Sequence, residues 1–100
     1  MPLRPVKILC IGNDPDLLRT RCAVLNHSGY EGTSATVLEA ENLLQTEIYD
    51  LVIISALLSE EDKRCALFAV GDAPVLVLQG LTMAAELLIL IEARLPLQAL

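Results

Sequence analysis

The chain has 100 residues, of which 54% are apolar and only 3% aromatic, and its formal net charge is −6. This length predicts a single domain over residues 1–100. The acidic balance and the lack of a Lys/Arg-rich run argue against nucleic-acid binding, which needs a basic face. No apolar stretch is long enough to cross a bilayer, and the N-terminus lacks a secretory pattern. We therefore expect a cytoplasmic protein without membrane contact.

The first strand and helix are predicted by an apolar run followed by a helix start. Residues 6–11 are apolar and rich in β-branched side chains, which favours a buried strand. Asp14 can cap a following helix, and Pro15 suits its first position. The helix is expected to end near residue 28, where Gly29 provides a left-handed cap. We expect its apolar face to be formed by Leu18, Cys22 and Leu25.

The middle of the chain predicts two more strands around a second helix. Residues 31–35 form a weak, short strand, and residues 36–46 repeat apolar side chains at helical spacing. Residues 49–55 form the strongest predicted strand. Its run Leu51-Val52-Ile53-Ile54 is continuously apolar, which is typical of a central parallel strand covered on both faces.

The last third of the chain predicts two helices separated by a strand. Ser59 followed by Asp62 resembles a capping box, and the helix that it begins ends near Gly71. Residues 75–78 form another buried strand, and residues 82–95 form a final helix. Residues 87–91 could instead form a fifth strand. The helix is favoured because no breaker precedes this segment and Ala-Ala-Glu promotes helix.

Three cysteines, Cys10, Cys22 and Cys65, are present, an odd number without C-x-x-C spacing. A disulfide framework and a zinc site are both poorly supported by this pattern. We expect the cysteines to be small buried hydrophobes. A redox or catalytic thiol stays open as the alternative.

Strands that alternate with amphipathic helices predict an α/β protein with a doubly wound parallel sheet. Four stretches then resemble the receiver domain of response regulators, which belongs to the flavodoxin-like (CheY-like) folds of two-component signalling. The stretches are Lys7–Leu18, Gly29-Tyr30, Tyr49–Ile54 and Pro74–Leu78. Their order and spacing cover essentially the whole chain. The resemblance implies a receiver shortened to about four βα units, with one helix and one strand missing.

The resemblance also implies a phosphorylation pocket, and the chain departs from it at each position. A receiver holds magnesium with an acidic pair after the first strand, where this chain has Gly12 and Asn13, followed by Asp14. The phosphoacceptor aspartate is replaced by Ser55, and the hydroxyl after the fourth strand by Gln79. The lysine segment has no counterpart. We therefore expect a degenerate pocket without catalysis, metal or cofactor, because a serine without a general base is a poor nucleophile.

The missing strand would leave residues 75–78 at an open edge, and the final helix is apolar nearly all round. We expect both features to be covered by a protein partner, most simply a second copy in a homodimer, with or without an exchanged C-terminal helix. A monomer is the alternative. The predicted interface residues are Val75, Val77, Leu81, Leu87, Leu88 and Ile91.

The preferred function is a phosphorylation-independent receiver-like signalling module that acts through protein–protein contact or dimerisation. The alternative is a small-molecule or anion sensor that uses the crevice at the carboxyl ends of the strands. An enzyme is disfavoured because no serine or cysteine has an identifiable base. The single histidine, His27, is expected at the end of the first helix.

Overall fold

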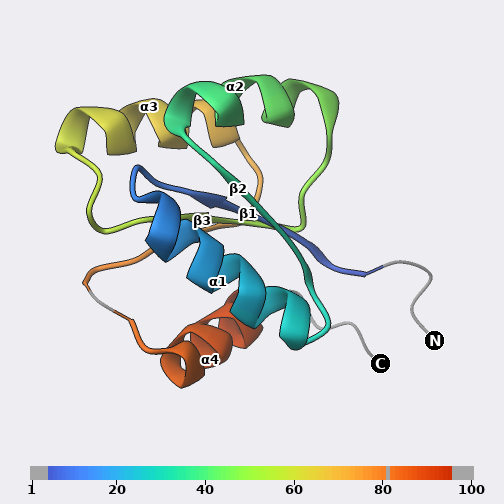
Figure 1. Cartoon of the computed structure of the whole chain (residues 1–100). Helices are drawn as coiled ribbons and strands as arrows, with labels where there is room; N and C mark the ends of the chain where they lie inside the picture. Colours follow the sequence, from blue (N-terminus) through green and yellow to red (C-terminus); the bar gives the residue numbers. More distant parts are fainter. Residues whose placement is uncertain (1–4, 81, 96–100) are drawn as a thin grey trace.

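A computed structural model of the protein describes residues 5–80 and 82–95, which form four strands and four helices in strict alternation (Figure 1). The predicted α/β fold and its order of elements are confirmed. The elements are β1 (Lys7–Ile11), α1 (Pro15–His27), β2 (Glu31–Ala35), α2 (Val37–Thr46), β3 (Leu51–Ile54), α3 (Glu60–Val70), β4 (Val75–Val77) and α4 (Ala84–Arg94).

The four described strands form one parallel sheet in the order β2-β1-β3-β4. Helices α1 and α4 cover one face and α2 and α3 cover the other (Figure 1). Leu51 and Ile53 of β3 belong to the buried layer on one face, and Val52 and Ile54 belong to the layer on the other. Because both faces are covered, the run is continuously apolar. Strand β1 alternates in the same way.

Polar side chains fix the starts of the helices. The Asp14 carboxylate accepts hydrogen bonds from the backbone N–H groups of Asp16 and Leu17, at 3.0 and 3.3 Å, as expected for the α1 cap. The capping box predicted at Ser59 is only half formed, with the Asp62 N–H donating to Ser59. A reciprocal box forms instead at α2.

The buried face of α1 differs from the predicted one. Leu18 and Leu25 lie in the core as expected, but the third buried side chain is Arg21, while Cys22 is half-buried. Cys65 is exposed, so the expectation that all three cysteines are buried is wrong for it. Cys10 is buried in β1.

The final apolar segment is a helix, so the alternative of a fifth strand over residues 87–91 is wrong. Leu87 and Ile91 are buried between α4 and the sheet. On its outer side α4 exposes Ile89 and Leu90, and Met83 is exposed just before it. The sheet therefore covers one side of α4 and leaves the other side exposed. Within the described ranges, no helix has the length and apolar character needed to cross a membrane.

Candidate functional site

The positions that correspond to a receiver phosphorylation pocket lie together at the carboxyl end of the sheet. Gly12 follows β1, Ser55 follows β3, and Gln79 lies two residues beyond β4. The Gly12 N–H donates to the Ala35 carbonyl, and the Ser55 N–H donates to the Ile11 carbonyl, at 3.1 and 3.0 Å. The sheet therefore holds Gly12 and Ser55 in adjacent, fixed places, and Gln79 lies at its exposed edge.

Gly12 is tightly packed, so a side chain at this position would require its neighbours to shift. A Cβ atom built on it would lie 3.2 Å from Cβ of Ser55 and 3.2 Å from Cδ2 of Leu18. Both neighbours are buried. Leu18 and Ser55 therefore leave little room for a side chain at Gly12.

The remaining polar groups of this end of the sheet have structural partners. Oδ1 of Asp14 accepts both N-cap hydrogen bonds, and Asn13 is exposed. Residues 5–80 and 82–95 contain no cluster of three or more His, Cys, Asp or Glu placed to hold a metal ion. A single carboxylate that already caps a helix does not match the hard-oxygen set that magnesium prefers.

Ser55 is 2% exposed, and its hydroxyl oxygen accepts a hydrogen bond from the Leu57 N–H at 3.2 Å. Such a bond shapes the turn that follows β3. His27 lies at the opposite end of α1, and the 13 residues of this helix span about 20 Å. Histidine therefore cannot serve as a base for Ser55 in this fold.

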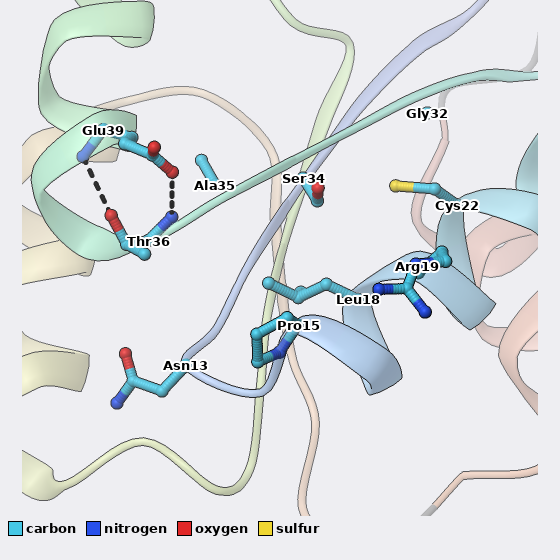
Figure 2. Close-up of a pocket in the computed structure, with 10 residues that line it drawn as sticks. All are labelled: Asn13, Pro15, Leu18, Arg19, Cys22, Gly32, Ser34, Ala35, Thr36 and Glu39. Carbon is cyan, nitrogen blue, oxygen red and sulfur yellow. Dashed lines mark hydrogen bonds between the residues drawn. The ribbon is translucent and has the colours of Figure 1, made fainter.

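A cavity lies beside this site, between α1, β2 and the start of α2 (Figure 2). It has a volume of about 530 Å³, and of the predicted pocket residues only Asn13 lines it. Its other lining side chains come mainly from the facing sides of α1 and β2. They include Leu18, Arg19, Cys22, Ser34 and Glu39. The cavity therefore lies beside β2, at the opposite edge of the sheet from β4 and Gln79.

Two side chains cover the outer edge of β4. Pro74 and Leu78 exchange backbone hydrogen bonds with β3, so the backbone groups of Val75 and Val77 point outward. Nη1 of Arg94 donates to the Val75 carbonyl at 3.0 Å, and Nε2 of Gln79 donates to the Val77 carbonyl at 3.4 Å. The predicted open edge is therefore partly blunted within the chain, as natural edge strands often are.

The predicted interface residues fall into three groups. Leu87 and Ile91 lie in the core of the single chain and are not part of its exposed surface. Val75 and Val77 are half-buried at the edge. Leu88 is half-buried and lines an apolar groove of about 500 Å³ between α1 and α4. Leu81 lies outside the described residues.

A thiol pair and a buried cation were not identified as a site by the sequence. Hydrogen bonds with the Cys10 thiol and the Ser34 hydroxyl lower the pKa of Cys22 to about 7, against the opposing effect of burial. The same contact with Cys22, together with burial, raises the pKa of Cys10. Arg21 is 5% exposed, and its Nη1 finds no hydrogen-bond partner within the described residues. Burial lowers the pKa of this guanidinium.

No protein-family model and no curated protein matches the chain. Among solved structures, a CheY-like response regulator receiver domain protein from Methanospirillum hungatei JF-1 matches with a TM-score of 0.65. The identity is 19%, over 90% of this chain and 93% of the other. A fusion protein that carries a trimeric coiled-coil segment of yeast Spc42 matches with a TM-score of 0.64. It is 24% identical, over 95% of this chain and 67% of the other. The chain therefore has the fold of a response-regulator receiver domain, in a form with four described βα units.

Proposed function

We propose that the protein is a receiver-like signalling module that works through protein–protein contact without being phosphorylated and without catalysis. The absence of phosphorylation is supported by the crowding at Gly12 and by the buried, turn-forming hydroxyl of Ser55. Both features remove groups that phosphoryl transfer requires, namely a metal cradle and a carboxylate nucleophile. A cytoplasmic location is part of the same proposal.

The observation that carries the proposal is the uncovered apolar side of α4. Ile89 is 66% exposed, Leu90 and Met83 are also exposed, and Leu88 lines the neighbouring groove against α1. We name Met83, Leu88, Ile89 and Leu90 the α4 surface. Exposed apolar patches of this kind mark interaction sites in soluble proteins.

The partner that we propose for the α4 surface is a second copy of the chain. Isologous contacts are the commonest way in which a self-complementary surface closes, and α4 packed against α4 around a two-fold axis would cover both apolar sides. The edge of β4 contributes less than the sequence indicated, because Arg94 and Gln79 satisfy its two outward carbonyls. The contact is therefore expected to be made by side chains of α4 and not by strand addition.

Sedimentation velocity over a wide concentration range tests this proposal. Ile89→Glu places a charge in the α4 surface and is expected to convert the dimer to a monomer. The matched control is Phe68→Glu on α3, because Phe68 is 90% exposed on the opposite face and should not contribute. Loss of the dimer in the control but not in Ile89→Glu would place the interface on α3 and reject the α4 surface. A monomeric wild-type chain at all concentrations would reject self-association itself.

The alternative, a small-molecule or anion sensor, is favoured by one observation, the cavity between α1 and β2. Its lining contains one basic and one acidic side chain, Arg19 and Glu39, which suits a zwitterionic or uncharged polar molecule better than a phosphate. A thermal-shift screen with nucleotides, inorganic phosphate and amino acids separates the two functions. A saturable rise in melting temperature for one class would favour the sensor.

A further inference from the structure

Two thiols from adjacent elements meet at the cavity between α1 and β2. Cys22 lines this cavity, and in Figure 2 its sulfur points away from α1 toward β2. Cys10 lies in the middle of β1, fully buried, and is paired in register with Ser34 of β2, which also lines the cavity. Cys22 is thus accessible from the cavity, and Cys10 lies in the core on the face of the sheet that α1 covers.

Gly32 allows this close approach. A Cβ atom on Gly32 would lie 3.4 Å from Cα of Cys22 and 3.2 Å from Cβ of Leu25. Without a side chain at this position, α1 packs close to β2 at the level of Cys22. The glycine therefore lets Cys22 approach β2 closely, beside the Ser34 that lines the same cavity.

The surroundings favour a reactive sulfur at Cys22. The hydrogen bonds from Cys10 and Ser34 stabilise its thiolate, and the pKa of Cys22 is lowered to about 7. A thiol with this pKa is about half ionised at neutral pH, against a few per cent for an ordinary cysteine.

We propose that Cys22 and Cys10 form a redox pair, in which a small hydroperoxide oxidises Cys22 from the cavity and Cys10 then closes a disulfide. In the first step the Cys22 sulfur attacks the distal peroxide oxygen. The S–O bond forms, the O–O bond breaks, and sulfur is oxidised by two electrons while the released alkoxide or hydroxide takes up a proton. In the second step the Cys10 sulfur attacks the sulfenic sulfur. The S–S bond forms, and hydroxide leaves with the Cys10 proton as water.

Cys65 provides a control within the same chain. It is exposed on α3, on the opposite face of the sheet, and no disulfide partner lies beside it among the described residues. If exposure alone decided reactivity, Cys65 would be oxidised first. The pair predicts the reverse order, with Cys22 reacting a few-fold faster at neutral pH. The larger thiolate fraction is only partly offset by the lower nucleophilicity of a low-pKa sulfur.

The experiment treats the full-length chain with hydrogen peroxide in the presence and absence of a sulfenic-acid trap, followed by peptide mapping and intact mass. Three chains are compared: wild type, Cys65→Ser and Cys10→Ala. Wild type is expected to carry the trap at Cys22 before Cys65. Cys65→Ser is expected to lose two hydrogen atoms and remain a single chain without reductant. Cys10→Ala is expected to stop at the trappable sulfenic acid on Cys22.

Two results would overturn the redox pair. One is trapping at Cys65 with Cys22 unmodified in the wild-type map. The other is that peroxide adds oxygen atoms to Cys65→Ser while no disulfide forms between Cys10 and Cys22. The wild-type map decides the order of reactivity even if Cys10→Ala does not fold. These outcomes are independent of the dimer, because Cys65→Ser removes the exposed thiol that could link two copies.

Discussion

Gly12 and Ser55 are packed so closely that a single added carbon atom on Gly12 would lie 3.2 Å from Cβ of Ser55. This contact joins the ends of β1 and β3, the two central strands of the sheet. It occupies the place where a receiver holds its metal and its phosphoacceptor. The packing at the ends of these strands therefore supports, beside the substituted residues, our proposal that the chain works without being phosphorylated.

The contact predicts that an acid placed at Gly12 would lower the stability of the fold. Gly12→Asp should lower the free energy of unfolding by about 2–4 kcal/mol, because a carboxylate would enter a buried site already filled by Leu18 and Ser55. Asn13→Asp is the matched control. Asn13 is exposed, and its substitution should change stability by less than about 0.5 kcal/mol. Urea titration followed by circular dichroism measures both, and equal effects would show that the site is not crowded.

The edge of β4 predicts a change in association. Arg94→Met removes the hydrogen bond to the Val75 carbonyl and should cost about 1 kcal/mol of stability. It should also increase concentration-dependent aggregation, because an outward carbonyl becomes available to another chain. Arg64→Met on α3 is the control. Arg64 is exposed, and its substitution changes the net charge by the same amount. Static light scattering on warming compares the two variants, and identical onset temperatures would contradict a protective role for Arg94.

The buried guanidinium predicts a stabilising substitution. Arg21 packs between Leu18 and Leu25 on α1 with an unpaired Nη1 among the described residues. Arg21→Met should therefore raise the free energy of unfolding by about 1 kcal/mol or more, because a flexible apolar side chain replaces an uncompensated charge. Arg19→Met is the control. Its ion pair with Asp16 is exposed, so the effect should stay within about 0.5 kcal/mol. Destabilisation by Arg21→Met would mean that the guanidinium has a partner in solution.

The coupled thiols predict a pH dependence of stability. Because the pKa of Cys22 is about 7, the folded chain releases this proton before the unfolded chain does. The free energy of unfolding should then rise from about pH 7 toward the ordinary thiol pKa of about 8.5. Above that pH it should fall, because the raised pKa of Cys10 keeps this thiol protonated in the folded chain while the unfolded chain ionises it.

Cys22→Ser should remove the rise, whereas Cys65→Ser should leave the profile unchanged. The charged groups that face the Cys22 side of the cavity, Arg19 and Glu39, are present in both variants. Urea denaturation between pH 6 and about pH 10 in the presence of a non-thiol reductant measures the three profiles. A profile of Cys22→Ser that overlays the wild type would contradict the thiolate assignment.

The sequence predicted the elements well where local signals agree with tertiary burial. The Asp14–Pro15 cap, the continuous run of β3 and the Ala-rich start of α4 each favour the conformation that the structure has. These signals were sufficient for the parallel sheet and for the resemblance to receivers. They also placed Gly12 and Ser55 at the ends of adjacent strands.

The sequence could not predict features that depend on long-range packing. Arg21 and Cys22 differ by one position on α1, and hydropathy alone assigned the core position to the cysteine. The Arg94–Val75 hydrogen bond joins residues 19 apart, and no local pattern marks it. The contact of Cys10 with Cys22 depends on how closely α1 approaches β2, which Gly32 decides. A glycine opposite a helix was the only available signal, and it is a weak one.

Molar mass by light scattering behind a sizing column tests the central claim most directly, when the wild-type chain is measured before and after treatment with a small acyl phosphate and magnesium. The account predicts a dimer in both samples, with no phosphoryl group in the intact mass. A monomer that becomes a dimer only after treatment would contradict it and establish phosphorylation as the switch. A monomer in both samples would contradict the α4 surface as a self-interface.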